Sequence, residues 1–371
     1  MDKPKNPVLA SRSLLPRVLP LALASWASVL PAGAQERVLR ECEAPCLIRA
    51  ERVITFGEKT GPGYVGTPIG VVERSDGTWV LADREDQNRL KVFGADGSFL
   101  RSVGRAGDGP GEFRTINHLG LLDGDTIEVY DLGGLRIQRF GPRFEPGSIT
   151  RVPEFHAASM ARTTDGRRVV NAVVALPSGI GLPLHLLSED GQILASFGSE
   201  PPIEDLRASH RRHFSLTPRE TAWATPHTEY RLEEWSWEGR RLRTLVRNAP
   251  WLTRDGDLLL SPDGVPNPWV RAIREDREGR LWVVALVPGT DWESGVGPQE
   301  QFTGEVLTGI NNMERAFDTI IEVIDPDSGR ILGSQRLSMP VQGFVDDGRV
   351  YAVEITPIGD YRISVWELKL P

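Results

Sequence analysis

The sequence has few of the residues that build metal sites and disulfide frameworks, with two cysteines and six histidines among 371 residues. The two cysteines, Cys42 and Cys46, stand close together near the N-terminus. In an exported chain such a pair predicts one small disulfide loop. The alternative, half of a metal site, lacks a second Cys or His pair at ligand spacing. Either way, the pair can hold only a terminal segment.

Familiar catalytic motifs are also absent from the sequence. There is no Ser-His-Asp nucleophile elbow, no histidine pair with H-x-x-x-H spacing and no glycine-rich loop ahead of a helix. The stretch GRAGDGPG at 104–111 stands between two strand-like runs. Its glycines are therefore interpreted as turn residues and not as a phosphate cradle.

Long apolar runs are missing after the first 34 residues. Within the leader, a basic start precedes the 13-residue apolar run Val18–Leu30, and Ala32-Gly33-Ala34 supplies an A-x-A cleavage site. This order is typical of a secretory signal peptide, so residues 1–34 are predicted to be cleaved. A membrane anchor is the alternative, but the run is shorter than the roughly 20 residues that a spanning helix needs. A lipoprotein is disfavoured because Leu39-Arg40-Glu41, and not small residues, precede Cys42.

Lysine is scarce after the leader, where the positive charge is almost all arginine. The formal net charge is −8, and loss of the leader, with four basic residues and one acidic residue, makes it −11. An acidic protein repels phosphate backbones, so nucleic acid is disfavoured as a partner. No later segment is apolar enough to span a bilayer. The mature chain is expected to be soluble, monomeric and exported, in the periplasm or outside the cell.

The sequence does contain a repeat. Tight Asp-Gly or Glu-Gly turns recur, each followed by a β-rich run such as RLWVVALV at 280–287. Short strands joined by tight glycine turns are hairpins. One series of these glycines is spaced by 47 residues from Gly77 to Gly124 and by 42 residues from Gly124 to Gly166. These spacings fit the roughly 40–50 residues of a four-stranded propeller blade.

Six such units are predicted after the leader. Their inner strands are expected to begin near Ile69, Ile116, His156, Arg212, Trp269 and Val341. The last unit ends at Pro371 after three strands, whereas RVITFG at 52–57 stands alone before the first unit. We therefore predict an all-β fold, a six-bladed β-propeller over residues 52–371 made of four-stranded antiparallel blades. The N-terminal strand would close the ring by pairing with the last blade. Residues 35–51 form a separate N-terminal segment, and a β-sandwich or open array is the alternative fold.

One stretch carries a family resemblance. Residues 83–113, DREDQNRLKVFGADGSFLRSVGRAGDGPGEF, have an Asp at the end of the second strand, an Asn-basic-aliphatic opening of the third strand, and a Gly-Pro-Gly-x-Phe close. This pattern resembles the NHL repeat of exported bacterial six-bladed propellers. Asn88-Arg89 lacks the His of the motif that names the repeat, and the other blades match only in outline. The resemblance implies the fold but says little about the chemistry, because such propellers include binding scaffolds, lyases and lactonases.

Antiparallel blades place two kinds of connection on opposite faces. With the strands of a blade called a to d from the inside outward, the a–b and c–d turns share one face. The b–c and d–a connections share the other. The long segments 198–211, 248–268 and 288–316 all belong to this b–c/d–a face. Long loops on a rigid scaffold commonly carry function, so this is the predicted binding face.

The candidate ligand-binding residues are the aromatic and acidic residues of that face, namely Trp251, Trp269, Trp292, Asp131 and Glu229. Exposed aromatic side chains suit a protein, peptide or glycan ligand. The alternative is that the tryptophans pack the loops onto the disc. The segment 288–316 is interpreted as a lid, in which the helical spacing of Val306, Ile310, Met313 and Phe317 indicates a short helix. A binding scaffold without a cofactor is our first hypothesis.

The candidate catalytic residues are three histidines of the same face. His118 and His156 stand at blade entries and His227 follows a second strand, with acidic residues nearby. Together they could hold one Ca or Zn ion or act as acid and base. The second hypothesis is therefore a metal-dependent, lactonase-like lyase or hydrolase at the mouth of the central channel. The calcium lactonase pattern needs a Glu where this chain has Pro68-Ile69-Gly70. Asp83 is interpreted as a structural cap of the b–c turn.

Overall fold

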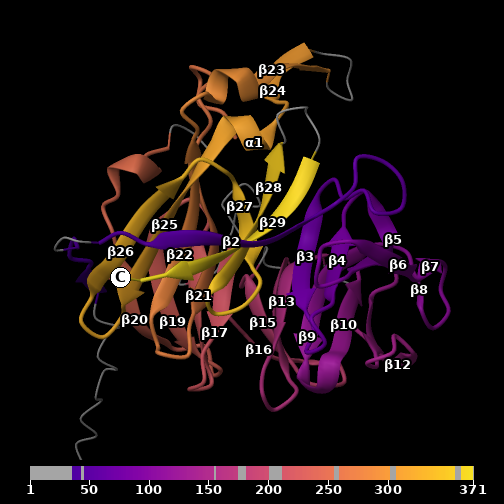
Figure 1. Cartoon of the computed structure of the whole chain (residues 1–371). Coiled ribbons are helices and arrows are strands. Elements are labelled where there is room, and N and C mark those ends of the chain that lie inside the picture. Colours follow the sequence, from indigo (N-terminus) through magenta and orange to yellow (C-terminus); the bar gives the residue numbers. More distant parts are fainter. Residues whose placement is uncertain are drawn as a thin grey trace, which may run out of the picture. The chain divides into compact units, whose positions relative to one another are not determined.

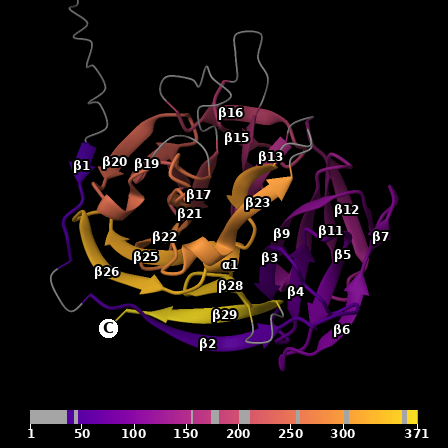
Figure 2. The same cartoon turned by 90° about the horizontal axis from the view of Figure 1, so that it is seen from above.

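The chain folds as an all-β, six-bladed propeller of four-stranded antiparallel blades, which confirms the predicted fold class. The computed structural model describes residues 36–42, 46–153, 156–173, 181–199, 211–254, 259–300, 306–355 and 361–370. Residues Ala34–Pro371 form one compact unit. Figure 2 shows the blades from above, arranged around the centre of the ring. None of the helices in the described part of the chain is both long and apolar enough to cross a membrane.

The first three blades follow one another along the chain. Blade one contains β3 (Pro68–Glu73), β4 (Trp79–Asp83), β5 (Asp86–Phe93) and β6 (Phe99–Val103). Blade two contains β9 (Ile116–Leu122), β10 (Thr126–Asp131), β11 (Arg136–Phe140) and β12 (Pro146–Arg151). Blade three contains β13 (His156–Arg162), β14 (Arg168–Val173), β15 (Leu184–Leu187) and β16 (Ile193–Phe197).

The other three blades complete the ring. Blade four contains β17 (Arg212–Leu216), β18 (Thr221–Pro226), β19 (Arg231–Ser236) and β20 (Arg241–Val246). Blade five contains β21 (Trp269–Glu275), β22 (Leu281–Pro288), β25 (Phe317–Asp325) and β26 (Arg330–Leu337). Blade six contains β27 (Val341–Phe344), β28 (Arg349–Ile355), β29 (Tyr361–Lys369) and, outermost, β2 (Arg49–Phe56).

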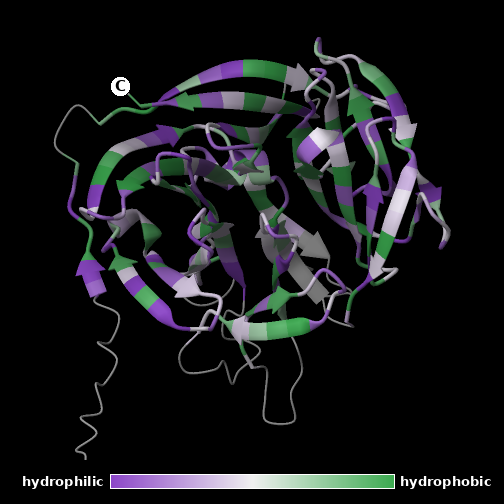
Figure 3. Cartoon of the chain, turned by 90° about the horizontal axis from the view of Figure 1, so that it is seen from below, coloured by the Kyte–Doolittle hydropathy of each residue, from purple (hydrophilic) through white to green (hydrophobic). Residues whose placement is uncertain are grey.

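Apolar packing joins each blade to the next. Hydrophobic side chains alternate with polar ones along many strands, as the banded colours in Figure 3 show, so that each sheet offers apolar surface to its neighbours. Six clusters of buried apolar residues result, one between each pair of adjacent blades. The cluster between blades six and one includes Phe56, Trp79 and Ile363. The packing is therefore continuous around the ring.

The N-terminal segment spans the outer edges of three blades. β1 (Glu36–Val38) pairs in parallel with β20 as a fifth strand of blade four. Arg40 then bridges to Arg330 at the edge of blade five. β2 pairs antiparallel with β29 from Arg49–Lys369 to Phe56–Ile363. Figures 1 and 2 show this belt, defined here as residues 36–56, passing from β20 to β29 along the outside of the ring.

The belt is attached by side chains as well as by its backbone. Leu39 is buried in the cluster between blades four and five, and Ile48 is buried between blades five and six. Cys42 and Cys46 are joined by a disulfide. The Cys46 carbonyl accepts a hydrogen bond from the Ser334 amide at 2.7 Å. The segment before β2 is therefore an integral part of the outer surface.

The a–b/c–d face is held together by polar contacts between blades. Charged side chains of the a–b turns and adjacent strand ends reach the neighbouring blade at most of the interfaces. The ion pairs are Arg168–Glu128 (2.8 Å), Arg219–Glu275 (2.7 Å), Arg274–Asp347 (2.8 Å) and Arg349–Glu73 (2.5 Å). Between blades one and two, the Ser75 amide donates to Asp125 at 2.8 Å. The η1 turn (Asp123–Asp125) lies on this face.

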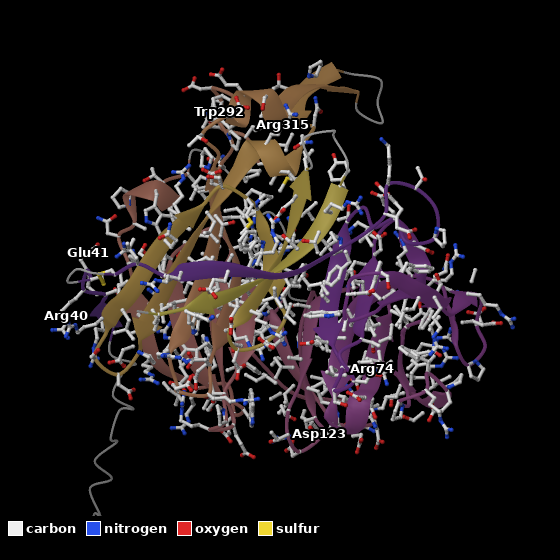
Figure 4. The ribbon with its side chains drawn as sticks, in the orientation of Figure 1. Arg40, Glu41, Arg74, Asp123, Trp292 and Arg315 are labelled. Carbon is white, nitrogen blue, oxygen red and sulfur yellow. A yellow bond between two sulfur atoms is a disulfide. The ribbon has the colours of Figure 1, made fainter. Side chains whose placement is uncertain are left out.

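The opposite face carries the longer connections. Among them are the short parallel pair β7 (Arg105–Ala106) and β8 (Glu112–Phe113), the η2 turn (Pro250–Leu252) and the insertion of blade five. In Figure 4, Trp292 and Arg315 of the insertion lie at the opposite end of the ring from Arg74 and Asp123 of the a–b turns.

The insertion differs from its predicted form. It contains η3 (Trp292–Gly295), a hairpin of β23 (Val296–Glu300) and β24 (Val306–Ile310), and α1 (Met313–Ala316). Of the four residues predicted to form the helical stripe, only Met313 lies in the helix, and Phe317 begins β25. Val306 and Ile310 are β-branched and are paired in the hairpin, and the helix starts only where the Asn312 side chain accepts from the Arg315 amide.

We predict that removing residues 35–57 prevents cooperative folding of the ring. This deletion exposes the edge of β29 and removes the fully buried Phe56, whose loss alone is expected to cost about 3–5 kcal/mol. From the sequence, removing only residues 35–46 was expected to lower the free energy of unfolding only slightly. The burial of Leu39 raises that expected cost to about 2–4 kcal/mol. Urea unfolding followed by tryptophan fluorescence measures both, and equal midpoints for the two truncations would contradict the prediction.

Candidate functional site

The inner strands share an irregularity near their b–c/d–a ends. In five blades one extra residue interrupts the pairing of the inner strand with the second strand. These bulge residues are Ile69, Asn117, Ala158, Arg271 and Gln342. A β-bulge turns the chain locally and redirects a side chain, and bulges often adjoin functional sites. The repeated bulge therefore shapes the inner rim, which we define as this end of the inner strands.

Blade four is the exception and places a histidine in the rim. β17 pairs with β18 without a shift, and His213 lies opposite Thr225. The His213 Nε2 atom is buried and has no hydrogen-bond partner among the described residues. Burial lowers the pKa of His213 well below its usual value, and the positive charge of Arg271 lowers it further. His213 is thus a neutral imidazole with an unused polar atom.

Arg271 links the rims of blades five and six. Its Nη2 donates to the Gln342 Oε1 at 3.1 Å, so two bulge residues from adjacent blades meet. Burial lowers the pKa of Arg271, and the neighbouring positive charges of Arg211 and Arg84 act in the same direction. Neither Arg271 nor Arg84 forms an ion pair with any residue in the described ranges.

Tyr351 extends the polar rim toward blade one. Its hydroxyl donates to the Ile69 carbonyl at 3.3 Å. A Cβ atom at position 343 would lie 3.1 Å from Cε1 of Tyr351, so Gly343 leaves room for the ring to reach the rim. Burial raises the pKa of Tyr351, which therefore keeps its proton at neutral pH. Polar groups thus run from blade four to blade one.

The two described candidate histidines lie in different places. His118 is on the inner strand of blade two, opposite Tyr130, and His227 follows β18 and accepts a hydrogen bond from the Val270 amide through its carbonyl at 2.8 Å. Burial lowers the pKa of each to about 4. The positive charge of Arg211 lowers the pKa of His227 further. Both rings are therefore neutral near pH 7.

The third histidine cannot be placed with them. His156 is the first residue of β13, and its side chain lies outside the described residues. Within the described part of the chain, no group of three or more His, Cys, Asp or Glu side chains is arranged to hold a metal ion.

Asp131 has a structural role in place of the expected ligand-binding one. Its carboxylate is fully buried, pairs with Arg136 at 3.0 Å and accepts the backbone amides of Arg114 and Thr115 at 3.1 and 2.8 Å. These contacts fix the d–a connection that enters blade two. Because the oxygens are engaged inside the fold, the carboxylate is not presented to a ligand.

Asp83 makes the equivalent contacts in blade one. It accepts the amides of Gly66, Thr67 and Glu85 and pairs with Lys91 at 2.9 Å. The Glu85 contact caps the b–c turn, as the sequence predicted. Asp83 and Asp131 thus mark a repeated device that ties strand b to the incoming connection.

The tryptophans mainly pack the loops onto the disc. Trp251 contacts Tyr230 edge-on at 5.8 Å, and Trp269 contacts Phe317 at 4.6 Å. Trp292 is half-buried and lies at the outer end of the insertion (Figure 4). Trp251 and Trp269 therefore pack the loops onto the disc, which was the alternative to a role in ligand binding.

Glu229 borders an open pocket of about 320 Å³ beside blade four. Tyr230, Arg247 and Leu252 also line this pocket. Glu229 is exposed, so its carboxylate remains available at the b–c/d–a face.

Comparison with known proteins supports the fold. A family model, DUF5128, described as a 6-bladed beta-propeller, matches residues 66–165. No curated protein matches the chain. The NHL resemblance remains a prediction, because the match is at the level of the six-bladed propeller.

Solved structures share the architecture at low sequence identity. A protein from Bacteroides fragilis that is named as exported is 11% identical, with a TM-score of 0.55 over 90% of this chain and 100% of that chain. A member of the duf4221 family from Bacteroides vulgatus is 12% identical, with a TM-score of 0.58 over 88% and 99%. Virginiamycin B lyase from Staphylococcus aureus is 11% identical over 87% and 100%, with a TM-score of only 0.46. Identities this low indicate a shared fold and leave the chemistry to the residues.

We predict that His118 makes the fold less stable as the pH falls from 7 to 5. The unfolded histidine takes up a proton near pH 6.5, whereas the folded one resists it until about pH 4. The free energy of unfolding should therefore drop by about 1–2 kcal/mol on account of this residue. Urea unfolding at both pH values should show a smaller drop for His118→Gln than for the wild type. An equal drop in the two proteins would contradict the neutral state of His118.

Proposed function

We propose that this chain is an exported binding propeller that recognises a protein, peptide or glycan on its b–c/d–a face. The observation that carries the proposal is the contrast between the two faces. On the a–b/c–d face, charged groups are paired across most of the interfaces between blades. On the other face, polar side chains that include Arg271, Arg84 and His213 have no such pairing among the described residues.

The insertion of blade five supports the same face. Its hairpin and α1 lie above the inner strands when Figures 1 and 2 are compared. Ala316 and Phe317 are buried with Leu286 beneath it, and Asn312 donates to the Tyr361 hydroxyl at 3.3 Å. The insertion is therefore anchored to blades five and six, and its half-buried Trp292 remains at the outer end. An anchored projection beside a polar rim suits a ligand held between the two.

Export follows from the leader and the disulfide. Residues 1–34 have the order of a signal peptide. The bond between Cys42 and Cys46 suits an oxidising compartment. The similarity to a Bacteroides fragilis protein named as exported agrees with this assignment. The mature chain would act in the periplasm or outside the cell.

A second candidate function is a metal-dependent lyase or hydrolase. The observation that favours it is the low pKa of His118 and His227, since neutral imidazole is the form that binds metals. Against it, these side chains come from blades two and four, and no described cluster completes a metal site. The binding scaffold is therefore the preferred function.

The proposed function predicts that binding maps to one face. Fluorescent mature protein, residues 35–371, should bind members of peptide or glycan arrays. Replacing the half-buried Trp292 and the exposed Glu229 of the b–c/d–a face, in the double variant Trp292→Ala with Glu229→Ala, should weaken that binding at least tenfold. Arg240→Gln, at an exposed c–d turn of the opposite face, is the matched control and should leave it unchanged. The proposal is wrong if the control abolishes binding while the double variant retains it.

The second candidate predicts stoichiometric metal. Elemental analysis of the purified mature protein should then find about one zinc or calcium ion per chain, which His118→Ala with His156→Ala should remove. Metal-free protein that binds its array ligand with full affinity, in wild-type and double-variant form alike, would exclude this candidate.

A further inference from the structure

We propose that the inner rim holds a carboxylate group of the ligand between Arg271 and His213, with Tyr351 and Gln342 completing the site. This inference rests on the proposed binding function and names the chemistry that the rim recognises. The four side chains come from blades four, five and six, so the site exists only in the assembled ring.

Arg271 supplies the positive charge. It is the extra residue of the bulge between Val270 and Ala272, on an inner strand that β17 and β27 flank. Within the described residues its side chain makes one hydrogen bond, to the neutral amide oxygen of Gln342 at 3.1 Å. Arg271 is half-buried, and a guanidinium that is partly removed from water is destabilised unless an anion compensates its charge. Among the residues that the structure describes, Arg271 has no such anion, so the compensating group is assigned to the ligand.

Further positive charges surround Arg271, from Arg211 and Arg254 beside blades four and five and from Arg84 in the b–c turn of blade one. The charges of Arg211 and Arg84 act on Arg271, and those of Arg211 and Arg254 act on His227. Arg254 is held in place by donating to the Pro268 carbonyl at 2.7 Å. Several positive charges at one rim attract an anion and raise its local concentration.

The acidic groups of this face come from several blades. Glu314 of the blade-five insertion and Glu85 of blade one act on Tyr361, and Glu85 also acts on Tyr64. Glu229 is exposed beside blade four. The carboxylate of a ligand would be directed to Arg271, where Arg211 and Arg84 add positive charge.

His213 provides the independent evidence for a ligand. Its Nε2 is a buried polar atom without a partner, on the strand next to Arg271. Buried polar atoms are nearly always hydrogen-bonded in native proteins. A neutral histidine that carries its proton on Nε2 would donate to one carboxylate oxygen, and the fork of Arg271 would engage the carboxylate plane.

Tyr351 and Gln342 fix the geometry of the site. The hydroxyl of Tyr351 is held at the rim by the Ile69 carbonyl, and its ring occupies the space left by Gly343. Gln342 orients the guanidinium of Arg271 without neutralising it. The donors are therefore positioned before the ligand arrives, which reduces the entropy lost on binding.

A carboxylate fits this rim better than a nucleic acid phosphate backbone. The chain has a net charge of −8, so long-range attraction for a polyanion is absent. One planar guanidinium with a nearby neutral donor matches a single planar anion. The carboxylate could belong to the end of a peptide or to an acidic sugar, and matched probes separate these sources.

The test is calorimetric titration of mature protein, residues 35–371, with paired probes. Acetyl-dialanine is compared with its C-terminal amide, and galacturonic acid with galactose. We expect the acid of one pair to bind at least tenfold more tightly than its neutral partner, and that pair identifies the source. Arg271→Gln should abolish this preference because it keeps hydrogen-bonding capacity and removes the charge. Arg240→Gln is the exposed control and should retain it, and unfolding midpoints establish that both variants are folded.

Four results would overturn the inference. The first is no acid preference in either pair at probe concentrations of about 10 mM, ten times a Kd of 1 mM. The second is an unchanged preference in folded Arg271→Gln. The third is equal binding of inorganic sulfate, which would indicate a general anion site. An array ligand that needs Trp292 and Glu229 but ignores Arg271→Gln would overturn the carboxylate site while leaving the proposed function intact.

Discussion

Apolar packing between neighbouring blades is the interaction on which the rest of this structure depends. A single four-stranded sheet has two faces and cannot bury both by itself. Here six buried clusters, one at each interface, cover both faces of the sheets. This requires that the last interface, between blades six and one, is filled as well. The outer strand β2 contributes Phe56 to that last cluster. Every side chain of the inner rim owes its position to this continuous packing.

The two faces of the ring use polar residues in different ways. Arginine–carboxylate pairs between blades reinforce the a–b/c–d face, where buried partners such as Arg168 and Glu128 satisfy each other. At the opposite face, buried aspartates tie the incoming connections to the second strands, which makes the rim rigid. The bulges then direct Arg271 and Gln342 into that rim. The stable scaffold and the polar site therefore come from separate sets of residues.

The sequence was sufficient for the repeat but not for the site. Asp-Gly turns are local signals, and five of the six inner strands begin at the predicted residue, whereas β3 begins one residue earlier, at Pro68. Bulges leave no such signal, because Arg271 and Gln342 look like ordinary strand residues until the pairing with the next strand is known. The burial of Asp131 depends on Arg136, Arg114 and Thr115 converging in three dimensions. The available hint was a polar residue just after the entry of four blades, namely Asn117, His213, Arg271 and Gln342.

The belt also determines when the native structure can be completed. Glu51 pairs with Lys369, 318 positions later in the chain. β1 pairs with β20, which also comes much later in the chain. Contacts between such distant residues form late, because a long loop must close before they contribute. The first described segment of the chain is therefore among the last to find its partners. Closure of the ring depends on the final strand, β29, because without it β2 and β28 lose their shared neighbour and both keep an open edge.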